Sequence, residues 1–380
     1  TSVKKRETMQ EGQRRAIISR TKRLVVKVGT GVITTREGFL DMPQVNNLSI
    51  QLVELRNKGY EVTVVSSGAI GAGMGEFGMK KRPTTLPELQ AAAAVGQSKL
   101  IRAYDDSFKT HGYHAAQILL TREDLEDRHR YLNTSNTIAT LLKMKAIPVI
   151  NENDTVSVEE IAFTDNDTLA ALVTNLLRAE LLVMLSSVDG LYKDPAGKEV
   201  IPVVEEITEE VEHLAFKSKT YLGTGGMQSK LQAARVATAS GEAVIVVNGR
   251  TPNVLVKIMQ GEPLGTLFLP ATQRLQSRKR WIGFTLRPRG RIYVDRGASE
   301  ALARKGKSLL ASGITRVEGD FERGDVISLF CDKEEFAKGL SNYSSEELEK
   351  IKGQPSSQIA KLLGTKPYDE VVHRDNMVLL

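Results

Sequence analysis

Two lysines in the chain each stand beside a run of glycine and small residues. Lys27 lies in the apolar segment 24–28 directly before a glycine turn, and Lys230 ends the glycine-rich segment 223–230. A lysine within an apolar strand is costly unless its ammonium group meets a partner, and backbone N–H groups at helix starts bind phosphate oxygens. Either lysine taken alone could be an ordinary solvent-reaching side chain. Together with their loops, they predict a site that neutralises charge during phosphoryl transfer.

Carboxylates gather in two polar clusters that follow the apolar run 147–150. The first cluster, 151–154, ends in Asp154, and the second, 164–167, contains Asp165 and Asp167 and opens a helical pattern. A polar loop with a helix cap is the simpler interpretation. As parts of a site, these carboxylates could hold a substrate ammonium, fix the lysines or help to ligate Mg²⁺. Neither cluster contains a histidine, and a carboxylate acceptor, ionised at pH 7, needs no base.

Apolar strands alternate with helical patterns about six times up to residue 250 or so. The strands are too apolar to be half-exposed, which predicts an α/β fold with an open, mainly parallel sheet and helices on both faces. The polar and glycine-rich strand ends should then meet at one edge of the sheet. Short β-type segments follow residue 278 and predict a small β-rich domain. We therefore expect a basic lead-in at 1–22, an α/β domain at 23–270 and a β-rich domain at 278–375.

Neither of the two familiar nucleotide motifs explains the glycines. Residues 73–78 match G-x-G-x-x-G but do not directly follow a strand, so we interpret the match as chance. No G-x-x-x-x-G-K-[ST] motif occurs in the sequence. The small residues 68–73 after the strand at 62–66 are instead expected to form a loop whose backbone approaches a ligand closely.

The net charge of +6 is concentrated at the start of the chain. Residues 1–23 contain eight Lys or Arg and two Glu, so the remainder is neutral. This lead-in is expected to be frayed and solvated. Residues 278–325 are also basic, and RNA contact there is a less favoured interpretation. The single cysteine excludes an internal disulfide, and no apolar run is long enough for a membrane span. A cytoplasmic protein is the expectation.

Seven motifs give the chain a specific resemblance. They are V-V-K-V-G-T (25–30), S-S-G-A-I (66–70), V-I-N-E-N-D (149–154), D-N-D (165–167), G-T-G-G-M-x-x-K (223–230), K-R-W-I (279–282) and V-H-R-D-N-M (372–377). Together they resemble the amino acid kinase family, in its glutamate 5-kinase branch with a C-terminal PUA domain. The resemblance implies ATP-dependent phosphorylation of the γ-carboxylate of L-glutamate to L-glutamyl 5-phosphate, the first step of proline biosynthesis. It also implies ATP and Mg²⁺ as cofactors, a homo-oligomer and feedback inhibition by proline.

The resemblance also implies roles for individual residues. Lys27 would contact the ATP phosphates, Asp165 would organise the two lysines, and Lys230 would stabilise the transferring phosphoryl group. Ser67, Asp154 and Asn166 would bind glutamate, with Asp154 anchoring the ammonium group and Asn166 acting as a neutral donor. The nucleotide would be bound by Lys27, Ser186, Ser187, Thr224, Gly225, Gly226, Met227, Gln228, Ser229 and Lys230. The family often has Thr-Asp where this chain has Ser186-Ser187, which puts the nucleotide contacts there in doubt.

Two other functions remain open from the sequence. The same fold could phosphorylate another acceptor, such as acetylglutamate, aspartate, carbamate or UMP. The acidic Asp154, suited to a free ammonium group, and the β-rich C-terminal segment argue against acetylglutamate. An RNA-binding protein would account for the second domain and the basic start, but it would leave both lysine loops unexplained.

Overall fold

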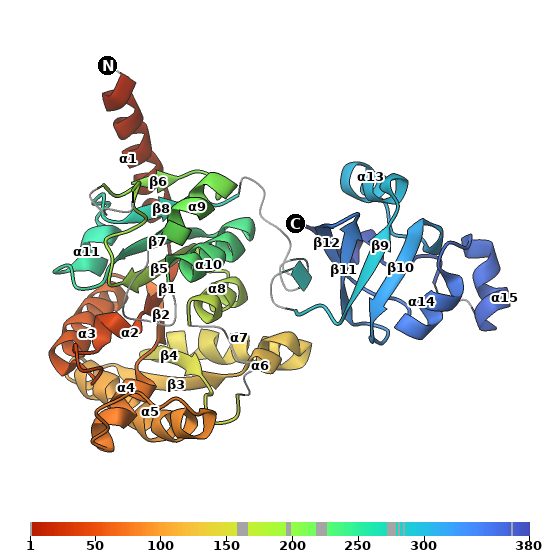
Figure 1. Ribbon diagram of the computed structural model, residues 1–380. Coiled ribbons are helices and arrows are strands. Elements are labelled where there is room, and N and C mark those ends of the chain that lie inside the picture. Colours follow the sequence, from red (N-terminus) through yellow and green to blue (C-terminus); the bar gives the residue numbers. More distant parts are fainter. Residues whose placement is uncertain are drawn as a thin grey trace. The chain divides into compact units, whose positions relative to one another are not determined.

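The structure is a computed structural model in which some residues are left undescribed. It describes residues 2–157, 166–194, 199–217, 226–271, 279, 282–283, 286–365 and 368–380, and for residues 2–8 it describes the backbone alone. The chain divides into two compact units, residues 1–274 and 275–380. Each unit is described by itself (Figure 1).

The first unit is built on an eight-stranded sheet with the strand order β3-β4-β2-β1-β5-β7-β8-β6. Every neighbouring pair is parallel except β7 and β8. The expected open, mainly parallel sheet is therefore confirmed. Its strands are β1 Arg23–Val28, β2 Glu61–Ser66, β3 His114–Leu120, β4 Ala146–Glu152, β5 Leu181–Ser186, β6 Val203–Val204, β7 Ala243–Asn248 and β8 Thr266–Phe268.

Helices cover both faces of this sheet. Figure 1 shows α3 and α11 on one side of the strands and α8 and α10 on the other. Alternate residues of β1, namely Leu24, Val26 and Val28, join the core cluster that includes α3, α5 and α11. Lys27 has the opposite orientation and lies toward α8. The helices of this unit are α1 Ser2–Arg20, α2 Thr30–Ile33, α3 Met42–Asn57, α4 Ala69–Glu76, α5 Leu86–Lys109, α6 Arg122–Glu126, α7 Arg128–Lys143, α8 Asn166–Leu177, α9 Glu209–Lys217, α10 Met227–Ala239 and α11 Val254–Met259.

The small residues 68–73 differ from the ligand-approaching loop that we expected. Ala69 already begins α4, and this helix packs closely on α5. A Cβ added to Gly73 would lie 1.8 Å from the carbonyl oxygen of Ala92, and one added to Gly96 would lie 1.7 Å from that of Ala69. These glycines therefore allow two helices to touch through their backbones. Gly68 alone keeps a loop conformation, with a φ of +108° that disfavours other residues.

The basic lead-in is a helix, and its last part is packed, so the expectation of a frayed, solvated segment is wrong for residues 14–20. Ile17 and Ile18 are buried in the core of the first unit. Arg14 is only 2% exposed. Its guanidinium donates to the carbonyl oxygens of Leu264 at 2.9 Å and of Pro202 and Gly265 at 3.3 Å. Burial lowers the pKa of Arg14 to about 10.

The second unit contains a five-stranded sheet with the order β10-β9-β11-β12-β13, which confirms the expected β-rich domain. The β9–β11 pair is parallel and the other neighbours are antiparallel. Its strands are β9 Gly290–Val294, β10 Ile314–Gly319, β11 Val326–Cys331, β12 Glu334–Leu340 and β13 Met377–Leu379. Its helices are α13 Arg296–Lys305, α14 Ser345–Ile351 and α15 Ile359–Leu363, with short 3-10 turns at Ala311–Gly313, Ser356–Gln358 and Arg374–Asn376.

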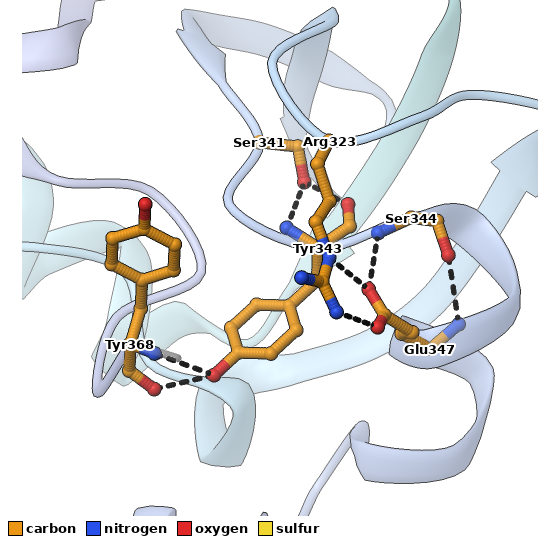
Figure 2. Close-up of polar contacts among 6 residues, drawn as sticks. All are labelled: Arg323, Ser341, Tyr343, Ser344, Glu347 and Tyr368. Atoms are coloured by element: carbon orange, nitrogen blue, oxygen red, sulfur yellow. Dashed lines mark hydrogen bonds and ion pairs between the residues drawn. The ribbon is translucent and has the colours of Figure 1, made fainter. Parts of the chain in front are cut away.

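A polar network holds the start of α14 in place (Figure 2). Ser344 and Glu347 form a capping box, in which each side chain accepts a hydrogen bond from the other's backbone N–H. The Arg323 Nε donates to the same Glu347 carboxylate at 2.9 Å. The Tyr343 hydroxyl donates to the carbonyl oxygen of Tyr368. Every group in this network thus has a partner within the unit, so we assign it a structural role.

Within the described ranges, no helix combines the length and the apolarity that crossing a membrane requires.

Candidate active site

The carboxyl ends of the parallel strands meet at one edge of the sheet, as expected. Strand register places Val28 of β1 beside Ser66 of β2 and Leu185 of β5. Ser186, which ends β5, lies beside Asn248 at the end of β7. The polar residues that follow these strands therefore converge although they are far apart in sequence, and this edge is where open α/β sheets bind ligands.

Two buried lysines share one buried carboxylate at this edge. The Lys27 Nζ lies 2.6 Å from Oδ1 of Asp167, and the Lys230 Nζ lies 2.9 Å from its Oδ2. All three side chains are nearly inaccessible to solvent. Burial alone would raise the pKa of Asp167, but the two ammonium groups hold it below its ordinary value. Asp167 is thus an anion that keeps two cations at a fixed separation inside the protein.

Asp167, to which the resemblance assigned no role, is a carboxylate that contacts both lysines. Asp165 itself lies outside the described residues, so its own contribution stays a prediction. The second polar cluster opens a helix, as its pattern predicted, but this helix does not have a single buried face. Instead, Asp167 and every residue from Leu169 to Leu177 are buried. Because α8 lies between the sheet and its neighbour α10, a carboxylate on either of its faces is removed from water.

Local structure explains how the lysines reach Asp167. Lys27 is the second-last residue of β1, and the chain then turns at Gly29, whose N–H donates to the carbonyl oxygen of Leu185 at 3.1 Å. A Cβ added to Gly29 would lie 3.0 Å from that oxygen and 3.5 Å from the Lys27 Nζ. Lys230 lies in the first turn of α10, four residues after its N-cap Gly226. The unfavourable helix dipole there is offset by the nearby carboxylate.

The residues expected to bind the nucleotide are only partly described. Thr224 and Gly225 lie outside the described residues. Gly226 caps α10, Met227 is buried in its first turn and Gln228 is exposed. The Ser229 hydroxyl is 3.3 Å from Oδ2 of Asp167 and donates to it, so Ser229 supports the carboxylate.

The two serines at the end of β5 have different surroundings. Ser186 is buried, and its carbonyl oxygen accepts a hydrogen bond from the N–H of Gly249 at 2.9 Å. Ser187 is exposed directly beyond the strand. Both therefore stand at the carboxyl edge, with only Ser187 open to solvent.

Ser67 and Asn166, two of the residues expected to bind glutamate, are in direct contact. Nδ2 of Asn166 donates to Oγ of Ser67 at 2.9 Å and to Oδ1 of Asn151 at 3.0 Å. Both N–H bonds of the amide are therefore used within the protein. In this arrangement the atom that Asn166 offers to a ligand is its acceptor Oδ1 and not the donor that we expected, and the contact with glutamate itself stays a prediction. Asn151, which sequence reasoning did not single out, is thus part of the site.

Asp154, the third of these residues, is an uncommonly basic carboxylate. Burial raises its pKa to about 6, while the charge of Arg82 acts in the opposite direction. A desolvated carboxylate gains more than an exposed one from a ligand's positive charge. Residues 158–165, between the two polar clusters and including Asp165, lie outside the described residues.

These groups suit a ligand that carries both charges and a polyanion beside it. The lysine pair is suited to bind negative charge, and Asp154 and the Asn166 Oδ1 are suited to bind positive charge. Across the described part of the chain, no three His, Cys, Asp or Glu side chains group as metal ligands would. Both Asp167 oxygens already contact lysines, so Asp167 leaves little room for direct metal ligation.

Comparisons with known proteins match the chain to two domain families and to full-length relatives. The family model of the amino acid kinase family matches residues 22–248, and that of the PUA domain matches residues 290–363. The chain is 51% identical to the glutamate 5-kinase of Syntrophotalea carbinolica over 96% of this chain and 99% of that protein. It is 50% identical to that of Geobacter sp. strain M21, covering 97% and 100%. The corresponding protein of Thermoanaerobacter sp. strain X514 is 49% identical, covering 94% and 98%.

A solved UMP kinase from Bacillus anthracis covers 66% of this chain and is itself covered to 96%. It has a TM-score of 0.45 and 14% sequence identity, values too low to bear on the substrate.

Proposed function

Because the chain belongs to the amino acid kinase family, in its glutamate 5-kinase branch, we propose that it transfers the terminal phosphoryl group of ATP to the γ-carboxylate of L-glutamate. The product is L-glutamyl 5-phosphate, the first intermediate of proline biosynthesis. The observation that carries this proposal is the buried Lys27–Asp167–Lys230 arrangement at the carboxyl edge of the sheet.

The chemistry requires charge neutralisation and alignment more than proton transfer. The attacking carboxylate is already ionised at neutral pH, so no general base is needed. Negative charge moves from the transferred group to the leaving phosphate, and fixed cations stabilise it. Lys27 and Lys230 supply such cations, and Asp167 holds them in place before the substrates arrive. The free-energy cost of burying these three charged side chains is incurred when the protein folds. The site therefore does not have to reorganise during the reaction.

The remaining polar groups suit the amino acid end of glutamate. Asp154 and the Asn166 Oδ1 accept hydrogen bonds and therefore bind the α-ammonium group. The Ser67 hydroxyl accepts from Asn166, which leaves its own proton available to a carboxylate oxygen of the substrate. This division of donors and acceptors supports a free amino acid over an N-acylated one.

Mg²⁺ belongs to the proposal as the partner of ATP. The ion prefers phosphate oxygens and water, with few protein ligands. Both carboxylate oxygens of Asp167 contact lysines, so this residue is poorly placed to ligate the metal itself. This fits a site in which Mg²⁺ arrives bound to the nucleotide. When bound, Mg²⁺ would neutralise phosphate charge alongside Lys27 and Lys230. The nucleotide contacts of Ser186, Ser187 and the segment from Thr224 to Lys230 are part of the same proposal.

Three further properties are proposed with the activity. Proline, the end product of the pathway, is a feedback inhibitor. The protein is a homo-oligomer, which is supported by the half-exposed Ala116 and Ile118 of β3, an edge strand. It acts in the cytoplasm, where ATP and glutamate are supplied. Steady-state inhibition by proline and light scattering of the purified protein test the first two.

The activity is tested by trapping its unstable product. Purified protein is incubated with MgATP, L-glutamate and hydroxylamine, and glutamyl hydroxamate and ADP are measured together. We expect both to form in equal amounts and only when glutamate is present. Turnover of acetylglutamate, aspartate, carbamate or UMP without hydroxamate from glutamate would refute the proposed acceptor.

A further inference from the structure

Asn166 stands at the end of a chain of side-chain amides that leads away from the site. Oδ1 of Asn151 accepts from Asn166, and Nδ2 of Asn151 donates to Oε1 of Gln97 at 3.0 Å. Nε2 of Gln97 in turn donates to Oε1 of Gln117 at 3.3 Å. Asn151 and Gln97 are both buried. The four amides come from α8, β4, α5 and β3, so tertiary packing alone brings them together.

A backbone group fixes the direction of this chain. The N–H of Glu152 donates to Oδ1 of Asn151 at 2.9 Å. A backbone N–H can only donate, so this atom of Asn151 must be its oxygen. Its Nδ2 must then face Gln97, which must present Oε1 there. If the Asn151 or the Gln97 amide turned over, two donors or two acceptors would face each other in a buried place, which is costly. Gln117, at the far end of the chain of amides, is exposed.

The same logic fixes the orientation of Asn166. Its Nδ2 is held between Oδ1 of Asn151 and Oγ of Ser67, so its Oδ1 is the atom left for a ligand. An amide that was free to turn over could accept from an ammonium group or donate to a carboxylate. A fixed amide offers the acceptor alone and so favours a ligand with a free ammonium group.

We propose that Gln97 is a positioning residue for substrate recognition. The N–H of Glu152 sets which end of the Asn151 amide is the oxygen, and Gln97 holds the Nδ2 end in place. Asn151, held at both ends, then keeps the Asn166 amide with Oδ1 toward the α-ammonium group of the amino acid. This inference rests on the proposed function and deepens it, because it assigns the discrimination for a free amino group to a relay that begins on α5. Gln97 itself does not touch the substrate in this proposal.

Two substitutions at Gln97 separate the relay from simple packing. Gln97→Met keeps the approximate volume and flexibility of the side chain but removes its donor and acceptor. Gln97→Glu keeps an acceptor for Asn151, and Gln117 can turn over to donate to it. A relay therefore predicts that Gln97→Glu resembles the wild type and that Gln97→Met is impaired. A packing role predicts the reverse order, since methionine packs well and a buried carboxylate does not.

Glutamate binding and turnover are measured for the full chain, with glutarate as a probe that lacks the ammonium group. For Gln97→Met we expect the glutamate KM to rise by about tenfold, as when one hydrogen bond to a charged group is lost. Its kcat and ATP KM should change by less than about twofold, and so should the inhibition constant of glutarate. Gln51→Met is the matched control, because Gln51 is a buried helix glutamine outside the relay whose Oε1 accepts from the N–H of Leu255.

The outcomes distinguish this inference from the proposed function. Absence of hydroxamate from the wild type refutes the proposed activity. In that case the variants are still compared by their affinity for glutamate, which is measured by calorimetry. The inference is overturned if Gln97→Met binds glutamate like the wild type, or if it weakens glutarate as much as glutamate. It is also overturned if Gln97→Glu is as impaired as Gln97→Met, or if Gln51→Met raises the glutamate KM equally.

Discussion

Replacing Asp167 with asparagine removes the charge between the two buried lysines while nearly preserving side-chain size. The lysine nitrogens lie 2.6 and 2.9 Å from its two oxygens. At an effective dielectric constant of about 20, each attraction at roughly 3 Å is on the order of 5 kcal/mol before desolvation is subtracted. Removing one partner of a buried ion pair typically costs about 3–5 kcal/mol. Asp167→Asn therefore strongly perturbs the local electrostatics.

The expected kinetic result follows from where the two cations go. Without the carboxylate, the ammonium groups repel each other, so one moves away or loses its proton. A displacement of about 1 Å at a reacting centre costs roughly 10²-fold in rate. We therefore expect Asp167→Asn to lower kcat by about 10²-fold or more, with a much smaller change in the glutamate KM. Rates are measured by hydroxamate formation, and urea unfolding checks that the variant remains folded.

Asp154→Asn is the matched control, because it makes the same chemical change at the other polar cluster. There we expect a higher glutamate KM and a kcat that is largely retained. Wild-type kcat in a folded Asp167→Asn variant would refute the reasoning. So would a pair of variants in which Asp165→Asn lost kcat and Asp167→Asn did not.

Three further predictions concern catalysis, pH and folding. Lys230→Ala should lower kcat by about 10²-fold and leave the glutamate KM within about threefold, because its ammonium acts on the transferring group; a raised KM with normal kcat would contradict this role. Since Asp154 must be ionised to hold an ammonium group and its pKa is raised to about 6, the glutamate KM should rise about tenfold from pH 7 to pH 5, and the profile should be flat in Asp154→Asn. Arg14→Met should lower the free energy of unfolding in urea by about 1–3 kcal/mol, because three carbonyl groups lose a buried donor. The exposed Arg15→Met makes the same charge change and should have little effect, so equal losses in both variants would rule out the buried contacts as the cause.

Much of the fold could be predicted from the sequence because its strands are strongly apolar. The runs that became β1, β2, β4, β5 and β7 are continuous, and the glycine or polar residue after each marks its end. Parallel strands place those ends together, so Lys27 and Lys230 could be expected at one site. The N-terminal helix was missed because Ile17 and Ile18 are few among many charges. Its docking also depends on carbonyl groups that lie about 190–250 residues away from Arg14.

By itself, the sequence determined the residue types that the site requires: two lysines, small residues around them and carboxylates at strand ends. Only the tertiary structure placed Asp167 between the two lysines, because α8 is buried and its sequence pattern does not show which neighbour each of its faces meets. It also decided that the amide atom which Asn166 leaves for a ligand is an acceptor. Sequence does not show which end of an amide points outward, and here that is set by a backbone N–H at Glu152 and by amides from other elements. Hydrogen-bond direction is a property of the packed neighbours, which only folding brings together.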